Sequence, residues 1–133
     1  MSIRRIAVLG AGNGGCAAAA DLTLRGYEVR LYSRSQATLD PILERGGIEI
    51  VEGGKARFAR PRMVTADIVK AVSGSDLIMI AAPSVAHEYL GKKLVPHLTD
   101  EQIIFLNPGH TGGSLHFACI LREQKAKAKI KIC

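Results

Sequence analysis

The sequence predicts an α/β domain in which a doubly wound parallel sheet carries helices on both faces. Three short apolar runs, at residues 3–9, 77–82 and 103–106, have the composition of strands that are buried on both sides. Segments with helical composition and glycine or proline boundaries lie between these runs. An alternation of strand and helix indicates a parallel sheet, and right-handed crossovers then place the helices on its two faces.

The composition is that of one soluble globular domain over residues 1–133. Hydrophobic residues make up 47% of the chain and charged residues 23%, far from the balance of a disordered protein. The net charge is +6, but four lysines of the tail supply most of it, and the remaining chain is nearly balanced. No nucleic-acid partner is therefore expected. These lysines are Lys125, Lys127, Lys129 and Lys131.

No segment predicts a membrane span, an export signal or a metal site. The longest uncharged apolar stretch, residues 77–85, is far shorter than the ~20 residues that a spanning helix needs. The apolar run behind Arg4 and Arg5 is too short for a signal peptide, which favours a cytoplasmic protein. The three cysteines have neither metal-ligand spacing nor the even number of a disulfide framework. The oligomeric state stays open.

The first third of the chain predicts two strands and two helices. Residues 3–9 form the first strand, and residues 16–25, rich in alanine and leucine, form the helix after it, which Gly26 is well placed to end. Residues 27–32 alternate in polarity like a second strand. Residues 36–45 predict a short second helix with a proline near its first turn.

The next segment predicts two strands and a short helix. Residues 48–50 and 58–64 are the strand candidates, and a turn with two glycines at residues 52–55 lies between them. Thr65 is placed to cap a helix over residues 66–72, because its side-chain oxygen can accept a bond from a free amide of the first turn.

The last part of the chain predicts two further helices and one more strand. Ser84 is placed to cap a helix that ends before Pro96, and residues 114–124 form the last predicted helix. Small apolar residues alternate with lysines over residues 126–132, which indicates a strand with one buried face.

A glycine-rich loop joins the first strand to the first helix and predicts a Rossmann-type dinucleotide site. In this context Gly10 permits a sharp turn, Gly12 lets the backbone approach a pyrophosphate, and Gly15 lets the helix pack close to the strand. With Asn13 and Gly14, these residues present free amides at the electropositive end of a helix. We therefore expect this loop to bind NAD or NADP.

The end of the second strand favours NADP as the cofactor. Ser33, Arg34 and Ser35 stand where an NAD-preferring domain carries an acid, ~20 residues past the glycine loop. No carboxylate is present there to repel a 2′-phosphate, and an arginine between two hydroxyls can bind one while its plane stacks on adenine. The alternative is a solvated surface arginine, with NAD bound through backbone contacts alone.

Two more loops follow predicted strands and are expected at the same edge of the sheet, where such domains bind ligands. Their candidate cofactor-binding residues are Ala82, Pro83, Ser84 and His87 in the first loop and Asn107, Pro108 and Gly109 in the second. No catalytic residue is predicted, because His110 in the second loop has no carboxylate nearby in sequence to orient it as a base.

Three longer motifs carry a resemblance to a known family. They are Ile-Ala-Val-Leu-Gly-Ala-Gly-Asn-Gly-Gly at residues 6–15, Ala-Ala-Pro-Ser-Val-Ala-His at 81–87 and Leu-Asn-Pro-Gly-His-Thr-Gly-Gly at 106–113. Together they resemble the N-terminal domain of the octopine/nopaline (opine) dehydrogenase family, over nearly the whole chain. The resemblance implies reductive condensation of a 2-oxo acid with an amino acid, by hydride transfer from NAD(P)H to an imine carbon.

Two departures from this family bear on function. The family loop commonly carries arginine where this chain has His110. The resemblance also implies a catalytic histidine and aspartate in a second, helical domain, to which nothing in this chain corresponds. We therefore expect a truncated chain that binds the cofactor. Small-molecule substrates are expected to bind only in a longer protein that contains this domain.

Three alternatives stay open. Glycerol-3-phosphate dehydrogenase has a similar first loop and an Ala-x-Pro-Ser-like loop, although that family is expected to present a lysine where the loop at residues 107–113 stands here. Ketopantoate reductase is a third candidate on the same grounds. A non-catalytic nucleotide-sensing module is an alternative of a different class.

Overall fold

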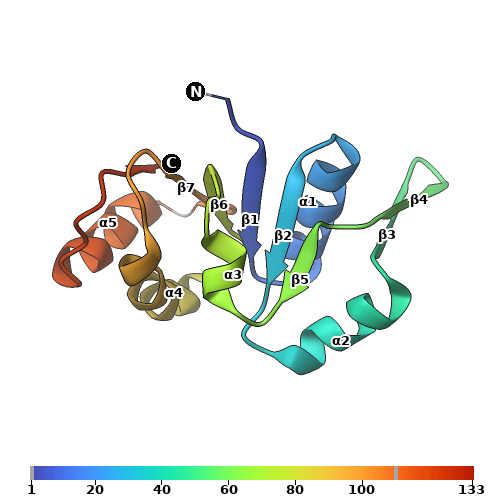
Figure 1. The fold of residues 1–133 in the computed structure, drawn as a ribbon, viewed down its shortest axis with the longest axis horizontal. Coiled ribbons are helices and arrows are strands. Elements are labelled where there is room, and N and C mark those ends of the chain that lie inside the picture. Colours follow the sequence, from blue (N-terminus) through green and yellow to red (C-terminus); the bar gives the residue numbers. More distant parts are fainter. Residues whose placement is uncertain (1, 110) are drawn as a thin grey trace.

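The strands of the computed structural model, which describes residues 2–109 and 111–133, form a six-stranded sheet in the order β5-β2-β1-β6-β7-β8. Every neighbouring pair in it is parallel. The chain starts in the middle and winds outward in both directions (Figure 1), so the predicted doubly wound fold is confirmed. The strands are β1 (Arg5–Leu9), β2 (Glu28–Tyr32), β5 (Met63–Thr65), β6 (Leu77–Ile80), β7 (Ile103–Leu106) and β8 (Lys131–Ile132).

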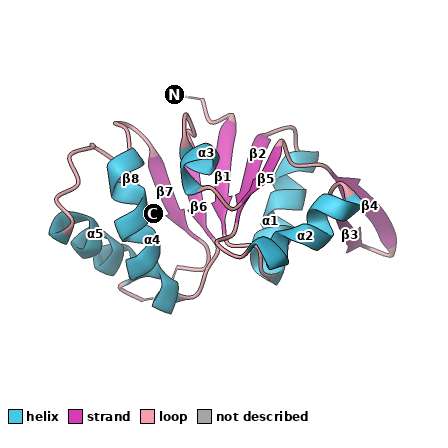
Figure 2. Cartoon of the chain, turned by 60° about the horizontal axis from the view of Figure 1, so that its bottom comes forward, coloured by secondary structure: helices cyan, strands magenta, loops and turns pink. Residues whose placement is uncertain are grey.

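Helices cover both faces of this sheet, as predicted. Alternate residues of β1 enter different cores: Val8 packs in the cluster with Ala19 and Ala20 of one helix, whereas Leu9 packs in the cluster with Phe117 of another. Figure 2 shows α1 and α2 toward one end of the sheet and α4 and α5 toward the other. The helices are α1 (Asn13–Leu24), α2 (Gln36–Arg45), α3 (Ile68–Val72), α4 (His87–Leu94) and α5 (Gly113–Glu123), with single 3₁₀ turns at η1 (Ser84–Ala86) and η2 (Val95–His97).

A hairpin lies outside the main sheet. Its strands, β3 (Ile48–Glu52) and β4 (Lys55–Ala59), pair antiparallel around Gly53 and Gly54, which both have positive φ. The strand expected at residues 58–64 is therefore two strands, β4 and β5, which belong to different sheets. Pro61 lies between them, and because proline has no amide hydrogen for a ladder bond, it favours a break at this point.

Both predicted side-chain caps were wrong. Thr65 is still paired with Tyr32 in the sheet, and α3 is capped two residues later by Asp67, whose carboxylate accepts bonds from the amides of Val69 (2.9 Å) and Lys70 (3.3 Å). Ser84 opens the 3₁₀ turn η1, and no side chain caps either η1 or α4. The helix expected after Ser84 therefore begins only at His87.

The tail ends as a sixth parallel strand, but this strand is shorter than predicted. Lys131 and Ile132 pair with β7, and Cys133 continues the ladder with backbone bonds to Ile104 (2.9 Å) and Leu106 (3.0 Å). Before them, the amide of Lys129 donates to the carboxylate of Asp100 (2.7 Å), and its carbonyl accepts from Glu101 (2.7 Å). These bonds join the tail to the loop before β7 instead of to a strand, which explains the shorter ladder.

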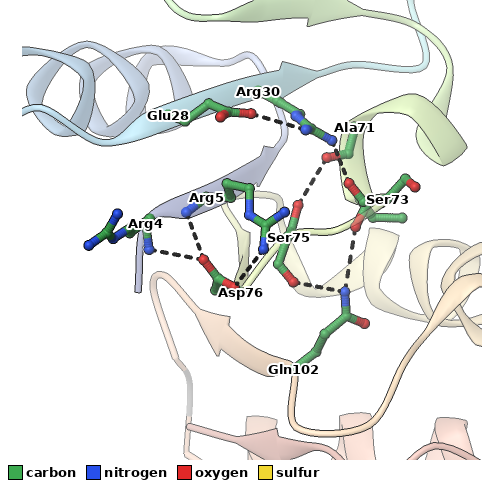
Figure 3. A network of polar contacts seen from close by, with 10 residues as sticks. Arg4, Arg5, Glu28, Arg30, Ala71, Ser73, Ser75, Asp76 and Gln102 are labelled. Carbon is green, nitrogen blue, oxygen red and sulfur yellow. Dashed lines mark hydrogen bonds and ion pairs between the residues drawn. The ribbon is translucent and has the colours of Figure 1, made fainter. Parts of the chain in front are cut away.

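A polar network joins the amino ends of three strands (Figure 3). The Asp76 carboxylate, before β6, accepts bonds from the amides of Arg4 (3.0 Å) and Arg5 (2.9 Å) at the start of β1. The buried side chain of Gln102, before β7, donates to the Ser75 carbonyl (3.0 Å) and accepts from the Thr99 amide (2.8 Å). The starts of β1, β6 and β7 are therefore fixed relative to one another.

Candidate functional site

Gly10 and Gly15 make the close backbone contacts that their spacing predicts. Gly10 follows β1 with φ +121°, and a Cβ on it would overlap the carbonyl oxygen of Ala81 at the end of β6. A Cβ on Gly15 would overlap the carbonyl oxygen of Gly10. The Gly10 amide donates to the Tyr32 carbonyl at 2.8 Å. The loop is therefore packed against the ends of both neighbouring strands.

The space next to Gly12 and Gly14 is open. A Cβ on either residue would meet no atom within 4 Å, and both lie exposed with Asn13 at the start of α1. No side chain caps this helix at Gly12, and the first backbone bond there runs from Cys16 to the Gly12 carbonyl (2.9 Å). The first turn of α1 therefore has room and positive electrostatic potential for an anionic group.

A pocket of about 240 Å³ lies at the carboxyl ends of β1, β2 and β6, beside α4. This is the point at which the strand order reverses, where doubly wound sheets bind ligands. Four of the predicted site residues line it: Gly10, Ser33, Arg34 and Ala82. The other lining residues are Tyr32, Val85, Ala86, Tyr89 and Leu90, which sequence reasoning missed. Val85, Ala86, Tyr89 and Leu90 follow Ala82 at helical spacing, which was the available signal for them, whereas Tyr32 ends β2.

Two tyrosines and Arg34 form one wall of this pocket. The Arg34 guanidinium lies 5.3 Å from the centroid of the Tyr89 ring, a cation–π contact. Burial, together with the neighbouring Tyr89 phenol, raises the pKa of Tyr32 to about 12. The Tyr32 phenol therefore stays neutral at physiological pH.

The hydroxyls of Ser33 and Ser35 accept local backbone bonds. Ser33 Oγ accepts from the amide of Ser35 (3.2 Å), and Ser35 Oγ caps α2 by accepting from the amide of Thr38 (3.4 Å). Arg34 thus extends from a loop whose backbone is held on both sides. Ser35 does not line the pocket.

His87 does not lie where the sequence suggested. Its side chain is 1% exposed, and its ring packs edge-on against Phe117 of α5, with 5.9 Å between the ring centroids. As the first residue of α4, it faces the neighbouring helix instead of the crevice. His87 therefore does not line the pocket, unlike Ala82 of the same loop. Pro83 and Ser84 are exposed beside the pocket without lining it.

The second loop lies at the same edge of the sheet but outside the pocket. The amide of Asn107 donates to the Ile80 carbonyl (2.9 Å), and Pro108 and Gly109 are exposed beyond it. Gly112, with φ +74°, precedes α5, which no side chain caps. His110 lies outside the described residues.

In the described chain, no helix has the length and apolarity to cross a bilayer. Residues 2–109 and 111–133 also contain no group of three or more histidine, cysteine or acidic side chains that could hold a metal ion.

Comparison with known proteins gives one family and several relatives. The family model described as Ketopantoate reductase PanE/ApbA matches residues 6–114. An opine dehydrogenase of Arthrobacter sp. (strain 1C) is 43% identical over 121 residues, which are 90% of this chain and 33% of that protein. A glycerol-3-phosphate dehydrogenase (NAD(P)+) of Moorella thermoacetica is 32% identical over 99 residues, 74% of this chain and 29% of that protein. The chain thus spans about a third of the length of the curated relatives it matches.

Solved structures share the fold. A structure of octopine dehydrogenase with NADH and L-arginine matches 96% of this chain and 34% of its own, with a TM-score of 0.80 at 24% identity. A PanE/ApbA family ketopantoate reductase from Ralstonia eutropha JMP134 matches 96% of this chain and 39% of its own, with a TM-score of 0.75 at 19% identity. At such identities the likeness establishes the architecture alone.

Proposed function

Because this chain belongs to the ketopantoate reductase PanE/ApbA family, we propose that it is the nucleotide-binding domain of an opine dehydrogenase-like oxidoreductase that prefers NADP to NAD. One observation carries the proposal: the open, uncapped first turn of α1 adjoins a pocket that presents an arginine and no acid from the end of β2. The first feature suits a pyrophosphate, and the second suits a 2′-phosphate.

The glycine loop would hold the pyrophosphate. A Cβ on Gly12 would meet no atom within 4 Å, so two phosphates can approach the amides of Gly12, Asn13 and Gly14. Backbone donors at the start of α1, with the partial positive charge of the helix end, stabilise the negative charge. Gly10 and Gly15 contribute by packing the loop, since neither has room for a side chain.

Arg34 would select the nucleotide. Its guanidinium lines the pocket and lies over Tyr89, so it is held near the place where the adenosine ribose would lie. Ser33 and Ser35 flank it in place of the acid that binds the ribose hydroxyls in NAD-preferring domains. A charge-assisted bond from Arg34 to a 2′-phosphate therefore favours NADPH.

In the whole enzyme, we propose that NADPH supplies hydride to the carbon of an imine formed from a 2-oxo acid and an amino acid. The relative at 43% identity is named for opine dehydrogenase, and this identity extends over 90% of the chain. Within this domain the loop at Asn107, Pro108 and Gly109 lies at the pocket edge of the sheet, where it would face the nicotinamide half. The domain's own task is to bind and orient the cofactor.

Glycerol-3-phosphate dehydrogenase is the second candidate, favoured by a relative at 32% identity over 74% of the chain. Activity assays on the longest protein that contains this chain should distinguish the two functions. NADPH oxidation with pyruvate and an amino acid would support the opine dehydrogenase-like function. NADPH oxidation with dihydroxyacetone phosphate would support the glycerol-3-phosphate dehydrogenase function. Nucleotide binding without either oxidation would favour a sensing module.

The nucleotide preference is testable on the 133-residue chain. In fluorescence titrations we expect NADPH to bind at least tenfold more tightly than NADH, and Arg34→Ala to remove most of this difference, since a charge-assisted bond contributes about 1.5–3 kcal/mol. Arg122→Ala, at an exposed position of α5, is the matched control and should keep the preference. Equal affinities of the wild-type chain, or a preference that Arg34→Ala leaves unchanged, would contradict the proposal.

A further inference from the structure

The ring of Tyr89 is shared by two cations that come from different elements. Tyr89 lies in the first turn of α4, lines the pocket and is 36% exposed. The guanidinium of Arg34, from the loop after β2, lies 5.3 Å from the ring centroid, and the ammonium of Lys93 lies 5.8 Å from it. Lys93 is one helical turn after Tyr89, so the helix brings its side chain back over the ring.

Neither cation is neutralised by a neighbouring acid. In the described part of the chain, the ion pairs of carboxylates involve other arginines and lysines, not Arg34 or Lys93. Lys92, the adjacent lysine, is different: its ammonium contacts the Glu88 carboxylate at 2.6 Å. Two positive charges without a paired acid thus lie around one ring of the pocket lining, and one of them, Arg34, lines the pocket itself. An anion between them would relieve their mutual repulsion.

We propose that Tyr89 and Lys93 are specificity residues for the adenosine 2′-phosphate. Tyr89 is a positioning residue that keeps the Arg34 guanidinium at the pocket edge, and Lys93 supplies a second positive charge to the same phosphate. This inference rests on the proposed function, because it takes the pocket to hold the adenosine half of the nucleotide. It adds to that function a second element, α4, which would contact the phosphate beside the loop after β2.

The placement of Tyr89 supports its positioning role. It lines the same pocket as Tyr32, a buried residue at the end of β2. The Tyr89 ring therefore lies close to the strand whose following loop carries Arg34. A fixed aromatic face restricts the guanidinium to fewer conformations, so less entropy is lost when the phosphate binds.

The test uses two small probes on the whole chain. Calorimetry gives the affinities for adenosine 2′,5′-bisphosphate and for adenosine 5′-monophosphate, which lacks only the 2′-phosphate, and their ratio measures the preference for that phosphate. Lys93→Met should lower this ratio about fivefold, an effect that shrinks at 0.5 M salt because the contact is exposed. The control Lys92→Met removes an equal charge from the next position and should change the ratio less than twofold. Tyr89→Ala should lower it about as much as Lys93→Met, and Tyr89→Phe, which keeps the ring, should restore it.

The outcomes separate this inference from the proposed function. If the preference exists and falls with Arg34→Ala, but Lys93→Met behaves like Lys92→Met, the role of Lys93 is wrong while the proposed function stands. If Tyr89→Phe loses as much preference as Tyr89→Ala, the hydroxyl and not the cation–π face matters, and the positioning role is wrong. If the wild-type chain binds neither probe, the proposed function fails and this inference fails with it.

Discussion

The backbone of α1 approaches the glycine loop so closely at Gly15 that a methyl group there would overlap the carbonyl oxygen of Gly10. The contact joins the first turn of the helix to the end of β1. No side-chain rotation can relieve such an overlap, because the position of the methyl group is fixed by the backbone of Gly15 and the oxygen belongs to the backbone of Gly10.

Replacement of Gly15 by alanine should therefore destabilise the domain. We expect the free energy of unfolding to fall by about 2 kcal/mol or more, since overpacking against the backbone exceeds the helix propensity that alanine gains over glycine. Urea unfolding followed by circular dichroism measures this change. Gly14→Ala is the matched control: its Cβ meets open space, so its effect should lie between zero and about 1 kcal/mol of stabilisation. Equal effects of the two variants would contradict the packing described for Gly15.

A second prediction concerns Gly12, where a larger side chain would fit in the protein alone but would occupy the space of the proposed pyrophosphate. Gly12→Val should fold, with a stability loss of about 1 kcal/mol for a β-branched residue at a helix N-cap, and should lower the affinity for both NADPH and NADH by at least tenfold. Nucleotide titration of a variant whose urea transition is still cooperative provides the measurement. If such a variant retained wild-type affinity, the pyrophosphate would have to bind elsewhere.

The third prediction is a pH dependence that arises at Asp76. Hydrogen bonds from the amides of Arg5 and Arg4 lower the pKa of this carboxyl below its ordinary value. Since its folded pKa lies below its unfolded pKa of about 3.9, the carboxylate stabilises the fold at neutral pH, and this contribution is lost as the pH falls through the folded pKa.

Asp76→Asn should accordingly cost about 1 kcal/mol at pH 7 and much less near pH 2.5. Unfolding by urea at both values checks the difference, and Glu49→Gln, at an exposed position of β3, serves as the control. A cost that stays constant between the two pH values would show that charge at Asp76 plays no part.

The sequence predicted the doubly wound parallel sheet and the glycine loop because both depend on local patterns. Buried parallel strands are continuous apolar runs, and Gly10 and Gly15 stand where only a residue without a side chain fits. The caps were not predictable in the same way. Whether Thr65 or Asp67 caps α3 depends on how far β5 stays paired with β2, which is a tertiary property.

The sequence predicted the pocket residues that lie in loops after strands, but it did not predict those that lie in α4. Arg34 and Ala82 follow strands, so their position at the pocket follows from the fold class. Tyr89 lies in the first turn of α4, and its proximity to Arg34 depends on how α4 packs on the sheet. The same packing turns His87 toward Phe117, which no periodicity in the sequence revealed.

The hydrogen bonds at Asp76 and Gln102 have a consequence for how such a domain can diverge. They use backbone groups of adjoining segments and lie at the end of the sheet opposite the pocket lined by Gly10 and Arg34. Insertions or exchanges in the loops at the pocket end of the sheet leave these bonds in place, so those loops can change without a shift in the register of the strands.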